Sequence, residues 1–183
     1  MTSKSHPRRL SQAEETLLGI LRAGDPMRHP SFKRTRYEFL LEYGWLYRPV
    51  KLPKGIRAGR ENECFNNAFL LALEDDSLTY CEGFVLSSNG QIPIHHAWVI
   101  NGAGRAIDNT LVVTAPAYFG VPFKTDFLDY YHLVPAAIVG LLDDYEKDWP
   151  ILKDLGDRPE EWLEKKGFGL KRLGQLAGLP KDY

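Results

Sequence analysis

The sequence predicts a single α+β domain, in which one helix packs on a small antiparallel β-sheet and further helices precede and follow it. Three observations predict this class. Apolar residues recur with a helical period in residues 11–22 and 64–73, whereas residues 78–110 alternate with the two-residue period of strands. The 183 residues also suffice for a core that needs no metal or disulfide. We therefore expect residues 1–183 to form one domain.

Two helices are predicted in the N-terminal part of the chain. Ser11 followed three positions later by Glu14 is a capping-box pattern, which predicts a helix over 11–22. A second helix is predicted over 35–45, after a stretch that glycine and proline interrupt. Residues 49–59 are rich in Pro, Gly and Lys, so we expect a loop there.

The next helix pattern, over 64–73, begins at a cysteine. Asn62 is a favourable N-cap residue, and this places Cys64 in the first turn. Unpaired N–H groups and the positive end of the helix dipole stabilise a thiolate at such a position. A lone cysteine is more often a small buried apolar side chain. Position by itself therefore makes Cys64 a candidate nucleophile and no more.

Three antiparallel strands are expected to follow this helix. They span residues 78–86, 95–101 and 105–110, with turns at 87–90 and 101–104. The second strand begins with two histidines, and an aspartate lies one hairpin later. A thiol, an imidazole that takes its proton and a carboxylate that orients the imidazole form a thiol triad. Taken alone, Asp108 beside Asn109 and Thr110 is typical of a turn.

Only one of the two histidines can meet the cysteine, because neighbouring strand residues point to opposite faces. The turn between the strands decides which histidine shares a face with Asp108. A two- or four-residue turn favours His95, whereas a three-residue turn favours His96. Gly104 suits the three-residue turn, whose last residue is left-handed.

Short motifs in this region resemble the core of the transglutaminase-like, papain-related superfamily: Tyr80-Cys-Glu-Gly-Phe, then His96-Ala-Trp, then Gly104-Arg and Asp108-Asn-Thr. The resemblance covers residues 60–112, and its most specific part is the His-Ala-Trp strand followed by Asp-x-Thr. It implies that Cys64 is the nucleophile, His96 its base and Asp108 the orienting residue, with Trp98 limiting water access beside them. Cys64 lacks the Gly-x-Cys-Trp surroundings of several members, so the resemblance does not indicate a substrate class.

Other residues are candidates for supporting roles. The backbone N–H of Cys64 is the expected oxyanion donor, and Asn62 or Asn67 could add a side-chain donor, although helix capping is the more ordinary role for Asn62. Residues 115–123 are expected to form an aromatic loop. This loop either packs on the sheet or lines a substrate cleft with Tyr118, Phe119 and Phe123.

The rest of the chain predicts less. Residues 143–183 are expected to be a helical C-terminal segment, with short helices over 143–155 and 159–166. Residues 133–142 are apolar, but their pattern assigns them to neither helix nor strand. Residues 1–10 are expected to be a flexible basic tail.

Charge is distributed unevenly. Through residue 60, lysine and arginine exceed the acids by 13 to 5, and from residue 61 onward the acids lead by 19 to 10. We favour a basic N-terminal segment that docks on an acidic C-terminal one. A partner such as nucleic acid is the alternative.

These features together predict a cysteine-dependent acyl-transfer enzyme, namely a peptidase, amidase, deamidase or transglutaminase-type enzyme that acts on a protein, peptide or small amide. No cofactor or metal is expected, because a zinc site from Cys64, Cys81, His95 and His96 lacks a close cysteine pair. The alternative function is non-catalytic binding of nucleic acid or protein through the basic N-terminal third. Two reduced cysteines and the lack of a long apolar run favour a cytoplasmic protein.

Overall fold

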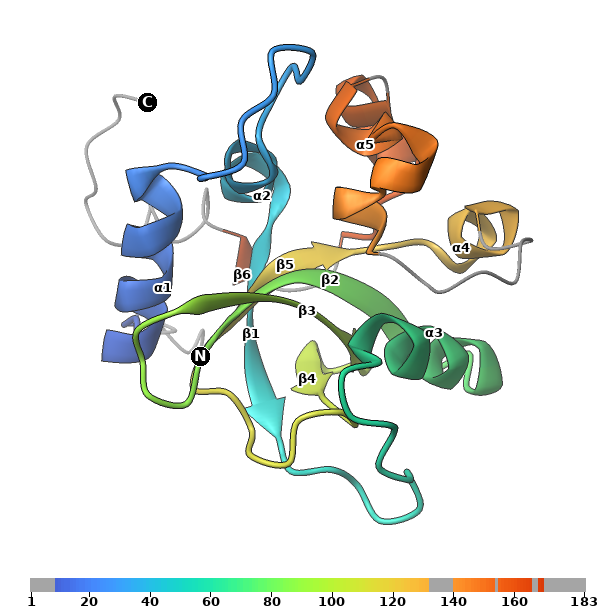
Figure 1. The fold of residues 1–183 in the computed structure, drawn as a ribbon. Coiled ribbons are helices and arrows are strands. Elements are labelled where there is room, and N and C mark those ends of the chain that lie inside the picture. Colours follow the sequence, from blue (N-terminus) through green and yellow to red (C-terminus); the bar gives the residue numbers. More distant parts are fainter. Residues whose placement is uncertain (1–8, 132–139, 154, 166–167, 170–183) are drawn as a thin grey trace, which may run out of the picture.

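The computed structural model describes residues 9–131, 140–153, 155–165 and 168–169, and its class is α+β (Figure 1). The α-helices are α1 (Gln12–Ala23), α2 (Arg36–Tyr43), α3 (Cys64–Glu74), α4 (Thr125–Tyr131) and α5 (Pro150–Lys153). The strands are β1 (Trp45–Val50), β2 (Thr79–Leu86), β3 (Pro93–Ile100), β4 (Arg105–Ile107), β5 (Tyr118–Pro122) and β6 (Phe168–Gly169).

The two N-terminal helices begin where the sequence predicts. The Ser11 side chain accepts a hydrogen bond from the Glu14 N–H, and the Glu14 carboxylate accepts one from the Ser11 N–H. Thr35 and Glu38 form the same reciprocal cap at the start of α2. Each box pairs two N–H groups that a helix start otherwise leaves without partners.

The sheet closes into a barrel, which the sequence did not predict. β1 pairs with β5 along one edge and with β4 along the other, so the order β1–β4–β3–β2–β5 returns to β1. The prediction of a loop over 115–123 was therefore wrong, because β5 lies within it. Gly120 and Pro122 interrupt its two-residue pattern, yet Gly120 is needed there: a Cβ would lie 2.7 Å from the Trp98 ring.

The β3–β4 hairpin has the three-residue turn that favours His96. Val99 pairs with Ile107 and Ile100 with Ala106, and the Asn101 N–H donates to the Arg105 carbonyl. Gly104 has the left-handed φ of 68° expected at the end of this turn. β4 ends at Ile107, three residues earlier than predicted.

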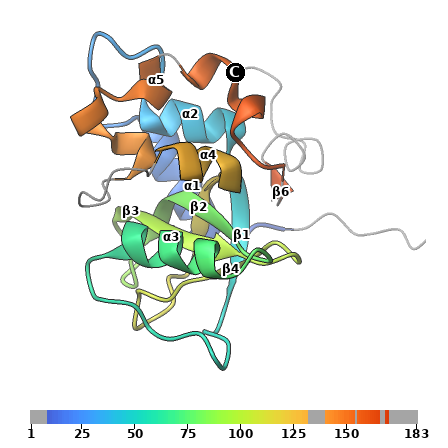
Figure 2. The same cartoon turned by 90° about the vertical axis from the view of Figure 1, so that its right-hand side faces the viewer.

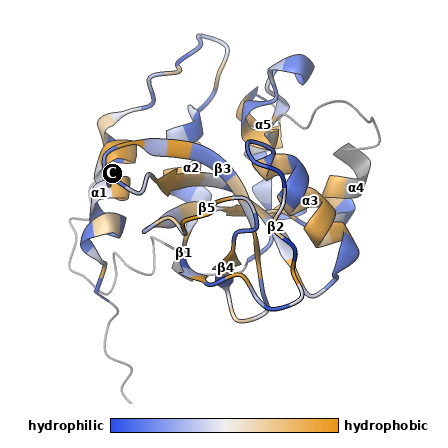
Figure 3. Cartoon of the chain, turned by 60° about the horizontal axis from the view of Figure 1, so that its bottom comes forward, coloured by the Kyte–Doolittle hydropathy of each residue, from blue (hydrophilic) through white to orange (hydrophobic). Residues whose placement is uncertain are grey.

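Side chains on the two faces of the barrel wall form separate apolar clusters. A smaller cluster, which the barrel encloses, includes Tyr47, Cys81, Trp98, Ala106 and Tyr118. The larger cluster lies outside the wall and is covered by helices, with α3 packed along β3 and α1 beside α2 (Figures 1 and 2). Figure 3 shows the apolar stretches on the strands and α3, while the connecting loops are largely hydrophilic. Histidines 95 and 96 therefore enter different environments.

Within residues 140–153 and 155–165, the described C-terminal part is less helical than predicted, and residues 170–183 lie outside the described residues. Instead of helices over 143–155 and 159–166, it has α5 and the single 3₁₀ turns Leu141–Asp143, Tyr145–Lys147, Leu155–Asp157 and Pro159–Glu161. The apolar stretch 133–142 lies mostly outside the described residues, as does most of the expected N-terminal tail. Lys33 pairs with Asp157 and Arg36 with Asp143, which confirms that basic N-terminal residues dock on acidic C-terminal ones. No helix in the described ranges has both the length and the apolar character needed to cross a membrane.

Candidate functional site

Cys64 is the first residue of α3 and is half-buried. The N-cap is Glu63, not Asn62, so the predicted cap was wrong: Asn62 is exposed and adopts a left-handed φ of 63° in the approach to the helix. Glu63 makes no capping side-chain hydrogen bond. The N–H groups of the first turn thus have no side-chain acceptor from the N-cap residue beside the thiol.

His96 lies on the inner face of β3 and is 3% exposed. Its Nε2 is 2.8 Å from Oδ2 of Asp108, just beyond the end of β4. Cys64 lies close enough to the same ring to contribute to raising the pKa of His96. Because Asp108 occupies Nε2, Nδ1 is the nitrogen that remains for the thiol. The structure thus pairs His96 with Asp108 and places Cys64 near the same ring.

Asp108 is held by four donors. Oδ2 accepts from His96 and from the Tyr118 hydroxyl at 2.9 Å, and Oδ1 accepts from the N–H groups of Thr110 at 2.9 Å and Leu111 at 3.1 Å. Burial raises the pKa of Asp108, but the hydrogen bonds and the charge of His96 outweigh burial and hold this pKa below its usual value. Asp108 is thus a fixed anion that orients His96.

The pKa of His96 is raised to about 9. Burial lowers this pKa, but hydrogen bonds to Asp108 and Cys64, together with the negative charges of these two groups, more than compensate. The imidazolium is therefore the stable form at neutral pH. A protonated imidazole can act as a general acid toward a reacting group beside it.

Trp98 packs beside His96 and Tyr118 inside the barrel. Its ring is stacked 6.5 Å from His96 and meets Tyr118 edge-on at 5.2 Å, and it is fully buried. The indole N–H has no hydrogen-bond partner in the described part of the chain. These aromatic neighbours surround His96 with a low-dielectric environment, which strengthens its interactions with charged partners.

Asn67 has a structural role. Its Oδ1 accepts from the Arg60 N–H, and its amide donates to the Arg60 carbonyl at 2.7 Å and to the Thr110 hydroxyl at 2.9 Å. Both amide hydrogens are thus in use, so Asn67 is not free to serve as the predicted oxyanion donor. Gly59 makes this contact possible, because a Cβ there would lie 2.3 Å from the Asn67 side chain.

Of the two alternatives for the aromatic residues after 115, the structure supports packing in the sheet and contradicts the substrate cleft. Tyr118, Phe119 and Phe123 are all 0% exposed. Tyr118 points into the barrel toward Asp108, whereas Phe119 and Phe123 belong to the outer apolar cluster. The hydrogen bond from Tyr118 to Asp108 could have been inferred only by predicting β5 as a strand. Gly120 and Pro122 interrupt the alternation that would have indicated this strand.

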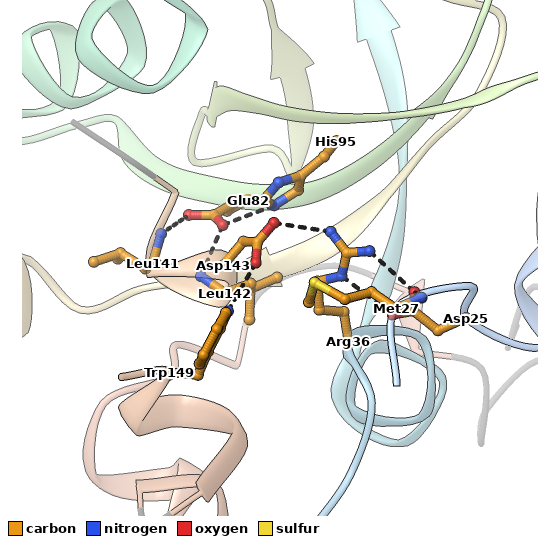
Figure 4. A network of polar contacts seen from close by, with 9 residues as sticks. All are labelled: Asp25, Met27, Arg36, Glu82, His95, Leu141, Leu142, Asp143 and Trp149. Atoms are coloured by element: carbon orange, nitrogen blue, oxygen red, sulfur yellow. Dashed lines mark hydrogen bonds and ion pairs between the residues drawn. The ribbon is translucent and has the colours of Figure 1, made fainter. Parts of the chain in front are cut away.

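A second histidine–carboxylate pair lies on the outer face of the same strands and was not predicted (Figure 4). Oε1 of Glu82 is 2.9 Å from His95 Nε2. The Glu82 carboxylate also accepts from the Tyr80 hydroxyl at 3.0 Å and from the N–H groups of Leu141 at 2.7 Å and Leu142 at 2.8 Å. An acid within an otherwise apolar strand, TYCEGFVL, was the only sequence feature that could have indicated it.

The zinc alternative has no support in the geometry. Across the described ranges, no three His, Cys, Asp or Glu side chains gather where they could hold a metal ion. Cys81 belongs to the enclosed cluster, where burial raises its pKa, and His95 lies on the opposite face of the wall. Both cysteines are free thiols.

Comparison with protein-family models, curated proteins and solved structures finds no match. The functional argument for this chain therefore depends on the chemistry of the site.

Proposed function

We propose that the chain is a cysteine-dependent acyl-transfer enzyme that acts on an amide. The Cys64 thiolate attacks the amide carbonyl carbon, and the first-turn N–H groups of α3 stabilise the resulting oxyanion. As the C–N bond breaks, the His96 imidazolium gives its proton to the leaving nitrogen. An amine departs, and the acyl group remains on Cys64 as a thioester.

The second step reverses the proton movement. Neutral His96 takes a proton from water, in a hydrolase, or from an amine, in a transferase, while this acceptor attacks the thioester carbonyl. The C–S bond then breaks, and the thiolate–imidazolium pair returns. Asp108 keeps Nδ1 of His96 directed at the sulfur throughout by holding Nε2.

One observation carries this proposal: His96 is bonded through Nε2 to the anchored Asp108 and lies near Cys64, and these two neighbours raise the pKa of His96 to about 9. The His96–Asp108 hydrogen bond alone is equally compatible with a purely structural role. The half-buried Cys64 at the start of α3, near this histidine, favours a catalytic role.

Iodoacetamide labelling from about pH 4 to 9, read by mass spectrometry for each cysteine, tests the proposal. Cys64 is expected to label well below pH 7, because the imidazolium stabilises its thiolate. Cys81 is the internal control: it is fully buried and its pKa is raised by burial, so it should stay unlabelled while the protein is folded.

The variant His96→Ala is the second control, with folding checked by circular dichroism. It should abolish the low-pH reactivity of Cys64. If Cys64 in the wild-type protein labels only with the profile of an ordinary thiol of pKa about 8.5, the proposal is wrong.

A further inference from the structure

Basic side chains between residues 25 and 60 fall into two groups. In the first, between residues 25 and 42, each has acidic partners within the protein. Arg36 contacts Asp25 and Asp143, each at 3.0 Å. Arg34 pairs with Glu42 at 2.8 Å, and Lys33 pairs with Asp157. These interactions account for the first group without a ligand.

The second group, here called the basic rim, leads from β1 to the thiol. It consists of Arg48, Lys51, Lys54, Arg57 and Arg60, one at every third position, together with Arg105, which pairs with Arg48 across β1 and β4. All six side chains are exposed. Within the described ranges only Arg60 has an ion-pair partner, Glu63 at 3.6 Å, and Glu61 is the other acid of this loop.

The basic rim is fastened to the candidate site. The Gly59 N–H donates to the Asn109 carbonyl at 2.6 Å, next to Asp108. The Arg60 backbone is bonded to Asn67, which also holds Thr110. Figures 1 and 2 both show the loop before α3 and the loop after β4 at the same end of the barrel. Cations on this loop therefore lie beside the approach to Cys64.

Large aliphatic side chains are exposed on the same two loops. Val112 is 88% exposed, Val113 66% and Leu52 36%. Exposed apolar groups among unpaired cations are typical of a surface that binds a partner. No Phe, Tyr or Trp occurs in residues 48–60 or 108–117. Surfaces for single-stranded nucleic acid stack bases on aromatic rings, so the rim is better suited to a peptide.

We propose that the acyl donor is an acidic peptide segment with aliphatic side chains, bound by the basic rim so that an amide reaches Cys64. This inference rests on the proposed function and specifies its substrate class. Carboxylates of the donor would pair with Lys54, Arg57 and their neighbours, and its aliphatic groups would contact Leu52, Val112 and Val113. The unequal charge of the two parts of the chain then has two causes: internal docking and substrate binding.

Two pools of hexapeptide chloromethyl ketones test the proposal, one containing Asp and Glu and the other the isosteric Asn and Gln. The rate of Cys64 alkylation is measured by mass spectrometry. At about 20 mM NaCl the acidic pool should label Cys64 about tenfold faster, and the difference should shrink at about 0.5 M, where exposed charges are screened.

Charge reversal locates the effect. The variant Lys54→Glu/Arg57→Glu should lose the acidic preference, whereas Arg9→Glu/Arg22→Glu, which reverses two exposed charges outside the rim, should keep it. Iodoacetamide labelling of each variant reports whether the thiol site is intact.

Equal labelling by the two pools, with Cys64 still reactive toward iodoacetamide, would overturn the substrate class and leave the proposed function standing. An unreactive Cys64 would overturn both. If the pools do not differ, and a labelled oligonucleotide binds the wild-type protein but not Lys54→Glu/Arg57→Glu, the rim is instead a nucleic-acid surface.

Discussion

His95 and His96 are adjacent on β3, and each is paired with a buried carboxylate, yet the two pairs have different surroundings. In the outer pair, His95 contacts the rings of Phe65 and Phe84, and Glu82 accepts hydrogen bonds from the backbone N–H groups of residues 141 and 142. The inner pair faces a half-buried thiol at a helix start. A histidine–carboxylate pair is therefore not a functional site by itself, because its remaining neighbours decide what it can do.

The largest expected effect concerns the outer pair. Glu82→Ala leaves His95, the Tyr80 hydroxyl and two backbone N–H groups without their acceptor in a buried place. The free energy of unfolding should fall by about 4 kcal/mol, as measured by urea denaturation. Glu61→Ala, at an exposed position, should change it by less than about 0.5 kcal/mol. An equally small effect of Glu82→Ala would show that the network does not stabilise the fold.

The inner pair should make stability depend on pH. The pKa of His96 is raised to about 9, so its contribution is complete below the unfolded value near 6.5 and is lost as pH rises through 9. Between pH 6.5 and 9.5 the wild-type protein should lose on the order of 3 kcal/mol more than His96→Gln. Parallel urea-denaturation profiles for the two proteins would contradict the raised pKa.

Thiol reactivity should separate the two histidines. At about pH 6, His96→Ala should slow iodoacetamide labelling of Cys64 on the order of 100-fold, because the imidazolium that stabilises the thiolate is gone. His95→Ala should change the rate by less than about threefold in the fraction that remains folded. Equal losses from both changes would mean that the inner pair has no special relation to Cys64.

The smallest expected effect concerns two tyrosines, each of which donates a hydrogen bond to the carboxylate of one pair. Tyr118 donates to Asp108 at 2.9 Å and Tyr80 to Glu82 at 3.0 Å. Each Tyr→Phe change should cost about 1 kcal/mol of stability. Only Tyr118→Phe should also raise the pKa of His96, measured by NMR titration of the imidazole, since Asp108 loses a donor and attracts the imidazolium more strongly. A shift from Tyr80→Phe would contradict this division of roles.

Much of the site could be predicted because its residues lie within one short stretch of sequence. Cys64, His96 and Asp108 belong to a helix and a hairpin whose patterns are local. Gly104 suited the turn that places His96 and Asp108 on one face, but it was the resemblance to a known superfamily that selected His96 over His95. The supporting residues were harder to assign. Asn62 is a residue type that often caps helices, but the N-cap position is occupied by Glu63. The aromatic residues after 115 have the sequence pattern of a loop, because Gly120 and Pro122 break the alternation typical of a strand.

The sequence by itself determined the elements whose partners are close along the chain: the Ser11–Glu14 capping box, the start of α2, α3 and the β3–β4 turn. Only the tertiary structure decided that β1 closes the barrel and that Glu82 binds residues 141 and 142, far along the chain. The physical reason is that local periodicity reports which face of an element is buried. It does not report which distant donor will satisfy a polar group on that face, since packing of the whole domain selects the partner.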